Sequence, residues 1–420
     1  MSHLSDLSYD VLSKITYFLS KQDILNLSET SKYLHDILYI VRFSDKIEFS
    51  KIASSSYYNS FINIECSTSK YFLPKFIQYL HWSSREPIKF NIPETVMHLY
   101  FINRYDHPLP KLPDSLTHLT LDNYSDEPLL QLPSSLTNLE LGDSYTKLLP
   151  QLPASLTHLT LGHSYNESLP ELPDSLTHLT LGNMYNHPLI ELPDSLTHLT
   201  LGNMYDHPFR LLPNSLTHLT LGMYYNQPFP QLSSSLTHFI SGMYYNQPLP
   251  RLPYRLTFLK FCNNYNQPLP QLPDSLTYLI LGWGYNQPLT QLPDSLTHLK
   301  LGSSYNQLLP QLPNSLIHLT LACMYNCPLP RLPGSLTHLI LGYHYNQPLP
   351  QLPDSLTNLD LGYSYNHPLL RLPNSLTHLI LSMSYSHPLP QLPDSLQMLK
   401  IPTTYNIPPN VPLKIISYRY

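Results

Sequence analysis

The chain has 420 residues, of which 12 % are charged, and its formal net charge of −5 without a basic stripe argues against nucleic acid as the main partner. No apolar run approaches the roughly 18 residues that a transmembrane helix needs, and the N-terminus lacks a signal-peptide pattern, so we expect no membrane association. The four cysteines show no framework spacing, which favours a reducing compartment and predicts a cytoplasmic protein.

Residues 1–42 differ in kind from the rest and predict a small module of three short helices. Leu12, Ile15 and Leu19 fall on one helical face, and two further apolar runs follow at residues 24–27 and 29–38. Helices this short bury too little apolar surface to be stable alone. The module therefore needs the rest of the chain or a partner.

The run LSDLSYDVLSKITYFL at residues 4–19, with the residues that follow to about 40, resembles the F-box. F-boxes are the modules by which substrate receptors dock on Skp1 in cullin-RING ubiquitin ligases. The resemblance places five apolar residues at positions that contact Skp1 or hold the helices in place: Leu7, Leu12, Ile15, Leu19 and Ile24. Ser8 and Asp10 depart from the usual proline and glutamate of the family. The alternative interpretation is a helical cap that closes the N-terminal end of a repeat array, and the two interpretations are compatible.

Residues 43–95 predict a linker and an N-terminal capping or degenerate repeat. Residues 46–49 alternate as a strand does. The run from Leu73 to Trp82 has the apolar spacing of the later repeats, although it is one residue short of their register. We expect Trp82 to cover the open end of the core.

Residues 96–401 repeat with a period of twenty, which is the signature of a solenoid. Leucine recurs at position 1 of each repeat, as at Leu116, and apolar residues follow at positions 4 and 6, as at Leu119 and Leu121. Positions 4 and 6 share the inner face of a strand, while the residues between them face outward. About sixteen strands are expected between Val96 and Ile401.

Proline occupies positions 13, 15 and 18 of many repeats, as at Pro268, Pro270 and Pro273. Proline at this density excludes helix and favours an extended return limb. The fold class is therefore mainly β: a leucine-rich-repeat-like solenoid with 20-residue turns and one parallel sheet, preceded by the three-helix leader. Residues 402–420 are expected to form a C-terminal cap with a final strand.

Tyrosine at position 10 and Asn or Asp at position 11, as in Tyr285 and Asn286, precede a run of the type Leu-Pro-Asp-Ser-Leu. This signature resembles the FNIP repeat family, a relative of leucine-rich repeats common in amoebae and in the large DNA viruses that infect them. If the chain is viral, the resemblance implies the host cytoplasm. We interpret the tyrosines as a stacked scaffold ladder, half inside the turn, with each hydroxyl reaching a polar partner. The residue at position 11 is expected to satisfy backbone groups of the same turn.

Position 3 is histidine in eleven repeats and predicts a column of imidazoles on the exposed sheet face. These residues are His98, His118, His158, His178, His198, His218, His238, His298, His318, His338 and His378. Stacked neutral rings and a zinc-holding surface are both consistent with the spacing. Evenly repeated histidines do not define a closed tetrahedral site, so neither metal nor cofactor is predicted. Repulsion between neighbouring imidazolium charges should lower the folded-state pKa values.

Positions 5, 8 and 9 vary from repeat to repeat and are the predicted place for recognition. Exposed Tyr, Trp and Met beside a sheet face are typical contact residues, and a solvated loop with neutral drift is the alternative. The target-binding candidates are Met223, Tyr224, Met243, Tyr244, Lys260, Trp283, Lys300, Met324, Tyr343 and His344.

No phosphate-binding glycine loop, paired carboxylates or catalytic triad stands apart from the repeat, so no enzyme is predicted. The predicted function is a substrate receptor of a Skp1-cullin-F-box ubiquitin ligase. Its array binds an unknown target protein, and the chain is a monomer outside the complex. The alternative is an interaction scaffold without a ubiquitin link, and a third class is a metal-sequestering histidine surface.

Overall fold

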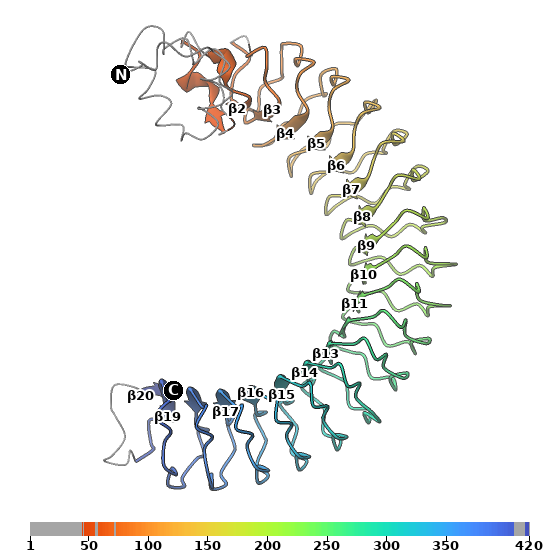
Figure 1. Ribbon diagram of the computed structural model, residues 1–420. Coiled ribbons are helices and arrows are strands. Elements are labelled where there is room, and N and C mark those ends of the chain that lie inside the picture. Colours follow the sequence, from red (N-terminus) through yellow and green to blue (C-terminus); the bar gives the residue numbers. More distant parts are fainter. Residues whose placement is uncertain (1–43, 45, 55–57, 71–72, 407–415, 420) are drawn as a thin grey trace, which may run out of the picture. The chain divides into compact units, whose positions relative to one another are not determined.

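The computed structural model describes residues 44, 46–54, 58–70, 73–406 and 416–419. The chain divides into two compact units, residues 1–187 and residues 188–420. In each unit, short parallel strands form one side and proline-rich return limbs form the other (Figure 1). The predicted leader, with Leu7, Leu12, Ile15, Leu19 and Ile24, lies outside the described residues. None of the helices within the described ranges has the length and apolarity to cross a membrane.

In unit 1 each strand pairs in parallel with the next strand along the chain. The strands are β1 (Ile47–Glu48), β2 (Asn63–Cys66), β3 (Tyr79–Trp82), β4 (His98–Phe101), β5 (His118–Thr120), β6 (Asn138–Glu140), β7 (His158–Thr160) and β8 (His178–Thr180). Two 3-10 helices, η3 (Phe49–Lys51) and η4 (Tyr58–Ser60), lie between β1 and β2.

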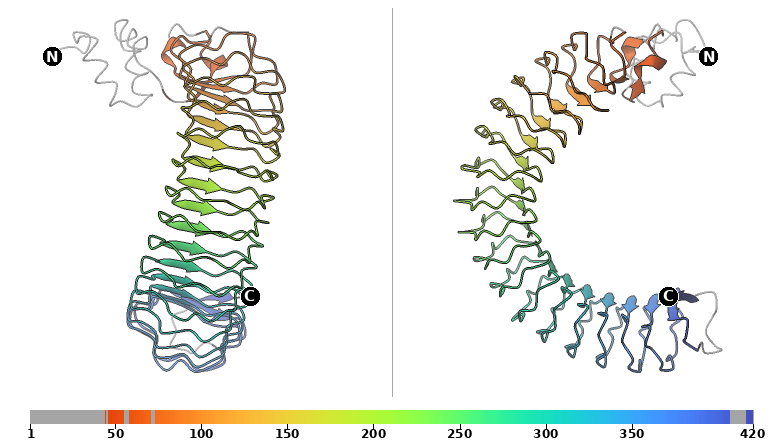
Figure 2. Two further views of the ribbon diagram at one scale, coloured as in Figure 1. Left: turned by 90° about the vertical axis from the view of Figure 1, so that its right-hand side faces the viewer. Right: turned by 180° about the vertical axis from the view of Figure 1, so that it is seen from behind.

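Unit 2 continues the same arrangement in a parallel ladder (Figure 2). Its strands are β9 (His198–Thr200), β10 (His218–Thr220), β11 (His238–Ile240), β12 (Phe258–Lys260), β13 (Tyr278–Ile280), β14 (His298–Lys300), β15 (His318–Thr320), β16 (His338–Ile340), β17 (Asn358–Asp360), β18 (His378–Ile380), β19 (Met398–Pro402) and β20 (Ile416–Arg419). The sixteen strands expected between Val96 and Ile401 are β4 to β19, and the expected final strand is β20.

The apolar positions of the repeat build the core. Leu276 and Leu279, at positions 1 and 4, are fully buried, and Leu281 at position 6 is nearly so. Leucines at positions 14 and 17, such as Leu289 and Leu292, close the core from the return limb. A tight turn starts each strand of the array, because the position 1 N–H donates to the position 18 carbonyl three residues earlier, at 3.0–3.2 Å; position 18 is proline except at Ser233.

The position 10 tyrosines lie deeper than predicted. Tyr145 to Tyr365 are at most 1 % exposed, and successive rings stack with centroids mostly 6.0–6.5 Å apart. Some hydroxyls accept a hydrogen bond from a leucine N–H of the preceding repeat, as Tyr145 does from Leu129 at 3.2 Å. Others, including Tyr225 and Tyr245, are buried without such a bond. The ladder is therefore part of the core.

The asparagines at position 11 bridge repeats. The Oδ1 atom of Asn266 accepts a hydrogen bond from the backbone N–H of Asn286, 2.9 Å away in the next repeat, and the same bond recurs along unit 2. The prediction that this residue serves its own turn is therefore wrong. Each of these asparagines instead links its repeat to the next one through a hydrogen bond.

Glycine at position 7 lets the loops of many repeats approach closely, although residues such as Asp122, Cys262, Ala322 and Ser382 occupy this position elsewhere. A Cβ atom added to Gly302 would lie 1.5 Å from the carbonyl oxygen of Gly282 in the preceding repeat. We expect Gly302→Val to lower the free energy of unfolding by about 1–3 kcal/mol, because the two loops must separate. Urea denaturation measures this loss. Ser303→Val, at the neighbouring half-exposed position, is the matched control, and an equal loss in both variants would contradict the steric explanation.

The N-terminal part of unit 1 differs from the prediction in two ways. As expected, β3 pairs with β4 in parallel, with Tyr79 opposite His98. However, Trp82 does not cover the end of the core, because β2 and β1 add two further rungs beyond it. Strand β2 was not predicted, because Asn63 pairs with Tyr79 at an offset shorter than twenty residues.

Candidate functional site

The outward residues at positions 3 and 5 form a continuous surface in each unit, which we call the strand face. The position 3 histidines are half-buried and stack on one another, with ring centroids 4.2 Å apart for His198–His218 and for His218–His238. In the second group, His298, His318 and His338 stack at 4.3 and 4.1 Å. Stacked neutral rings are therefore the arrangement that the structure adopts.

A threonine at position 2 fixes the orientation of most of these imidazoles, whereas His98 follows Met97 and His318 follows Ile317. Thr157 donates its hydroxyl hydrogen to the carbonyl of Thr137 at 3.0 Å, and its Oγ1 lies 2.8 Å from Nδ1 of His158. A hydroxyl has one hydrogen, so the ring must donate through Nδ1–H. The neutral histidine then keeps its lone pair on Nε2. The same pair of contacts recurs at Thr217 and at other repeats.

Burial is the main cause of the histidine pKa shifts. The pKa values of His98, His118, His298 and His338 are lowered first by burial and then by neighbouring histidines. His81 on β3 shows the largest change, since burial, followed by Lys46, lowers its pKa to about 4. The predicted direction is confirmed at these positions, but repulsion between imidazoles is the smaller cause.

These shifts predict a loss of stability in mild acid. Below pH 6.5 the unfolded chain takes up protons that the folded chain resists, so the free energy of unfolding falls as pH falls. Allowing for solvent screening of this half-buried side chain, we expect about 1 kcal/mol at pH 5 from His81 alone. Urea denaturation at pH 5 and pH 7.5 measures the change, and His81→Gln should show a smaller drop. Equal stability at the two pH values would contradict this prediction.

The strand face does not form a closed metal site. Parallel stacked rings place equivalent nitrogens side by side, whereas tetrahedral zinc needs ligands that converge on one point. Across the described ranges, no group of three or more His, Cys, Asp or Glu side chains is arranged to hold a metal ion.

Positions 8 and 9, between the end of each strand and the buried tyrosine, form the second candidate surface, which we call the loop edge. Its backbone is held independently of its side chains, because the position 9 N–H donates to the position 8 carbonyl of the preceding repeat. Examples are Tyr244 to Met223 at 3.0 Å and His344 to Cys323 at 2.9 Å. The side chains of the loop edge can therefore vary without cost to the fold.

The structure brings the loop-edge candidates of unit 2 into two groups. In the first, Tyr224 and Tyr244 stack at 5.2 Å, with Met223 and Met243 half-buried beside them in sequence. In the second, Tyr343 lies 4.9 Å from His344 in an edge contact and stacks on Tyr363 at 4.3 Å. Tyr363 was not predicted, although the variation at position 8 could have identified it.

The remaining candidates occupy the middle of unit 2. Trp283 is 68 % exposed on the loop edge, and Met324 is also exposed there. Lys260 and Lys300 lie on the strand face instead, on either side of Ile280. Both lysines were predicted as binding candidates at position 5, and the register brings them close to Phe258 and Tyr278, two residues that were not predicted.

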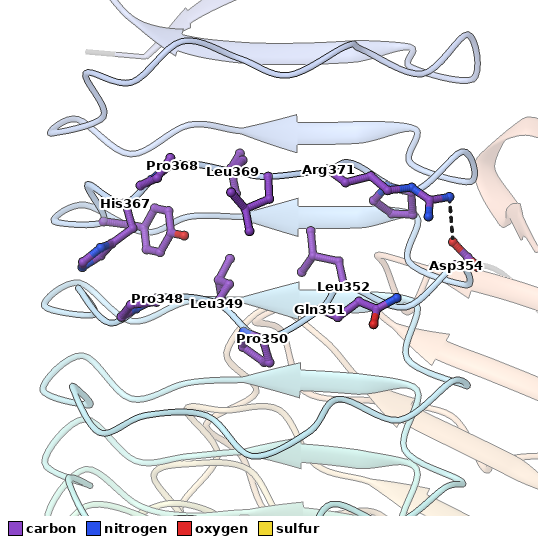
Figure 3. Close-up of a pocket in the computed structure, with 13 residues that line it drawn as sticks. Pro348, Leu349, Pro350, Gln351, Leu352, Asp354, His367, Pro368, Leu369 and Arg371 are labelled. Atoms are coloured by element: carbon purple, nitrogen blue, oxygen red, sulfur yellow. Dashed lines mark ion pairs between the residues drawn. The ribbon is translucent and has the colours of Figure 1, made fainter.

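The return limbs carry grooves between neighbouring repeats. Each of these grooves lies where one repeat has proline at position 15 and the next repeat has a residue other than proline there. The groove between Pro350 and Leu370 has a volume of about 370 Å³ and is closed at one end by a 3.7 Å ion pair of Arg371 with Asp354 (Figure 3). A similar groove of about 410 Å³ lies between Pro110 and Leu130. Both grooves are mainly apolar and suit side-chain docking rather than catalysis.

The stacked parallel rungs, the leucine core and the variable loop edge define a leucine-rich-repeat type of solenoid, a class typical of protein-interaction scaffolds. Within that class, the FNIP Repeat family matches the greater part of the array, and the chain belongs to this family. The matched ranges are residues 105–144, 127–164, 146–184, 165–204, 185–224, 245–284, 285–323, 325–364, 345–384 and 365–404.

Solved structures show the same fold. The chain is 31 % identical to CroV588, described as a novel circular LRR protein structure, with a TM-score of 0.62 over 90 % of this chain and 71 % of that chain. YopM from Yersinia enterocolitica is 21 % identical, with a TM-score of 0.62 over 96 % of this chain and 100 % of that chain. The Yersinia pestis YopM, described as a leucine-rich effector protein, is 24 % identical, with a TM-score of 0.54 over 84 % and 87 %. Among curated proteins no match was found.

Proposed function

We propose that the chain is a non-catalytic substrate receptor whose unit 2 binds a target protein and whose N-terminal residues dock on a Skp1-like adaptor. The observation that supports target binding is the set of exposed aromatic side chains on a loop edge with a fixed backbone. Tyr and Trp contribute large contact areas at low cost in side-chain entropy, and they dominate protein interfaces. Neither Trp283 nor Tyr343 contributes to the core, which leaves both available to a partner.

Target binding is tested with the full chain as bait. Partners captured by proximity labelling are compared between the wild type and the double variant Trp283→Ala/Tyr343→Ala. We expect a specific target to be lost from the variant, while the circular dichroism spectrum stays unchanged. Leu148→Ala, which removes an exposed leucine from unit 1, is the matched control. Identical sets of partners from all three proteins would contradict a role for the loop edge.

The ubiquitin link is supported by the F-box-like pattern of residues 4–40. In this proposal, the cytoplasmic monomer joins a cullin-RING ligase through Leu12 and Ile15, and the array presents the captured protein. Size-exclusion chromatography of the full chain with purified Skp1 tests it. We expect co-elution that Leu12→Glu/Ile15→Glu abolishes and that Leu148→Glu preserves. If Skp1 does not co-elute with the wild type, the scaffold without a ubiquitin link is the better description.

A further inference from the structure

On the strand face of unit 2, two neighbouring repeats have another aromatic residue in place of histidine at position 3. These residues are Phe258 and Tyr278, and the column of rings continues through them. The centroid distances are 5.6 Å for His238–Phe258, 5.9 Å for Phe258–Tyr278 and 4.1 Å for Tyr278–His298. The column therefore exchanges polar imidazoles for larger and less polar rings over this stretch.

Two lysines flank the same stretch at position 5. Lys260 pairs in register with Ile280, and Ile280 pairs with Lys300, so the lysines are two rungs apart. Two rungs correspond to roughly 10 Å between their Cα atoms. Neither lysine takes part in the ion pairs found among the described residues. The nearest acid at position 5 is Asp360, three rungs beyond Lys300.

The stretch from Tyr254 to Lys260 departs from the neighbouring repeats at outward positions. The core residues Leu256, Leu259 and Tyr265 are buried here as elsewhere. Outside the core, Tyr254 and Arg255 replace the usual Asp and Ser of the turn, and the guanidinium of Arg255 lies 5.6 Å from the Tyr254 ring. A third cation is thus placed three residues before Phe258.

We propose that Phe258, Lys260, Tyr278, Ile280 and Lys300 form a docking site for an acidic segment of the target protein. The proposal rests on the proposed function and names the chemistry that unit 2 recognises. Carboxylates of the segment bind the two lysines, and an apolar side chain packs on Ile280 and the flanking rings. Unpaired cations beside aromatic and aliphatic surface complement such a segment in both charge and polarity.

The lysine spacing also specifies the conformation of the bound segment. In a polyproline II helix, residues i and i+3 lie on the same face and are roughly 9.3 Å apart, which matches the two-rung separation. The recognised segment therefore has acidic residues three positions apart. Nucleic acid fits less well, because three cations neutralise too few phosphates and the chain is negatively charged overall.

Trp283 provides the signal for a direct test, because it lies in the same repeat as Ile280 and the other tryptophan, Trp82, is buried. The probe is an acetylated peptide of sequence Glu-Pro-Leu-Glu-Pro-Leu-Glu, titrated into the full chain with tryptophan fluorescence and calorimetry. We expect saturable binding that falls at least roughly tenfold when Lys260→Glu/Lys300→Glu is used or when glutamine replaces glutamate in the peptide. Lys400→Glu, at position 5 five rungs beyond Lys300, should bind as the wild type does.

Each other result overturns the proposal. No binding, equal binding of the glutamine peptide, or full binding by a lysine variant with a native circular dichroism spectrum would exclude acidic recognition at this site. Competition by single-stranded oligothymidylate that the lysine variant abolishes would reassign the site to nucleic acid. Partner capture that depends on Trp283 and Tyr343 but not on the lysines would leave the proposed function intact and refute this site alone.

Discussion

Alkaline unfolding of the array is expected between about pH 10 and pH 11.5, with the tyrosines ionising as the strands are lost. Burial raises the pKa of Tyr205, Tyr305 and Tyr365 to about 12 and raises the pKa of further ladder tyrosines, such as Tyr145, Tyr225 and Tyr285, in the same direction. The folded state holds these protons above pH 10, whereas the unfolded chain releases them. Stability contributed by the ladder is therefore complete below pH 10 and lost as pH rises.

The size of this effect follows from the number of tyrosines. At pH 11 each ladder tyrosine with a strongly raised pKa favours the unfolded state by about 1.4 kcal/mol relative to neutral pH, if its unfolded pKa is near 10. The ten tyrosines with the largest shifts, Tyr165 and Tyr205 to Tyr365, contribute about 14 kcal/mol, which is near the top of the stability range of ordinary domains. The exposed lysine–carboxylate pairs that alkali also weakens, such as Lys147 with Asp126, are each worth at most about 1 kcal/mol.

The measurement is a pH titration that records tyrosinate absorbance and circular dichroism together. The ladder tyrosines should ionise in one steep transition that coincides with unfolding. A gradual titration of all tyrosines with the strands intact at pH 12 would show that the ladder is open to solvent.

Much of this fold can be predicted from the repeat because its apolar positions have one structural role. Leucine at positions 1 and 4 has no polar group to satisfy, so period and polarity alone place it in the core. The burial of the position 10 tyrosines cannot be predicted in the same way, because the hydroxyl allows either a half-buried or a buried ring. Its full burial depends on how the loops stack, and Gly302 against Gly282 shows that this distance is short.

The candidate site was predicted less completely, because it depends on which residues of different repeats are neighbours. Variation at positions 5, 8 and 9 gave Lys260, Lys300, Trp283 and Tyr343 as candidates from the sequence. The neighbours of the two lysines follow only from the register, which sets Ile280 between them and brings Phe258 and Tyr278 close. Strand β2 escaped detection for a related reason, since its offset from β3 breaks the twenty-residue period.

Substitutions of two aromatic residues in the same loop should distinguish a position that stabilises the fold from a position that binds the target. Tyr285 is fully buried between the rings of Tyr265 and Tyr305, at 6.1 and 6.2 Å, whereas Trp283 in the same loop is exposed. We expect Tyr285→Ala to lower the free energy of unfolding by about 3–5 kcal/mol, because it leaves a large cavity. Trp283→Ala should change it by less than about 0.5 kcal/mol.

Hydrogen exchange and partner binding together distinguish the two variants. In a solenoid each repeat contacts only its neighbours, so Tyr285→Ala should lose amide protection around residues 265–305 and retain it in distant repeats. Trp283→Ala should keep native protection throughout and lose the captured target. Since the two side chains are two residues apart, a general disturbance of the loop would affect both measurements in both variants. That result would contradict the assignment of position 10 to the scaffold and of position 8 to recognition.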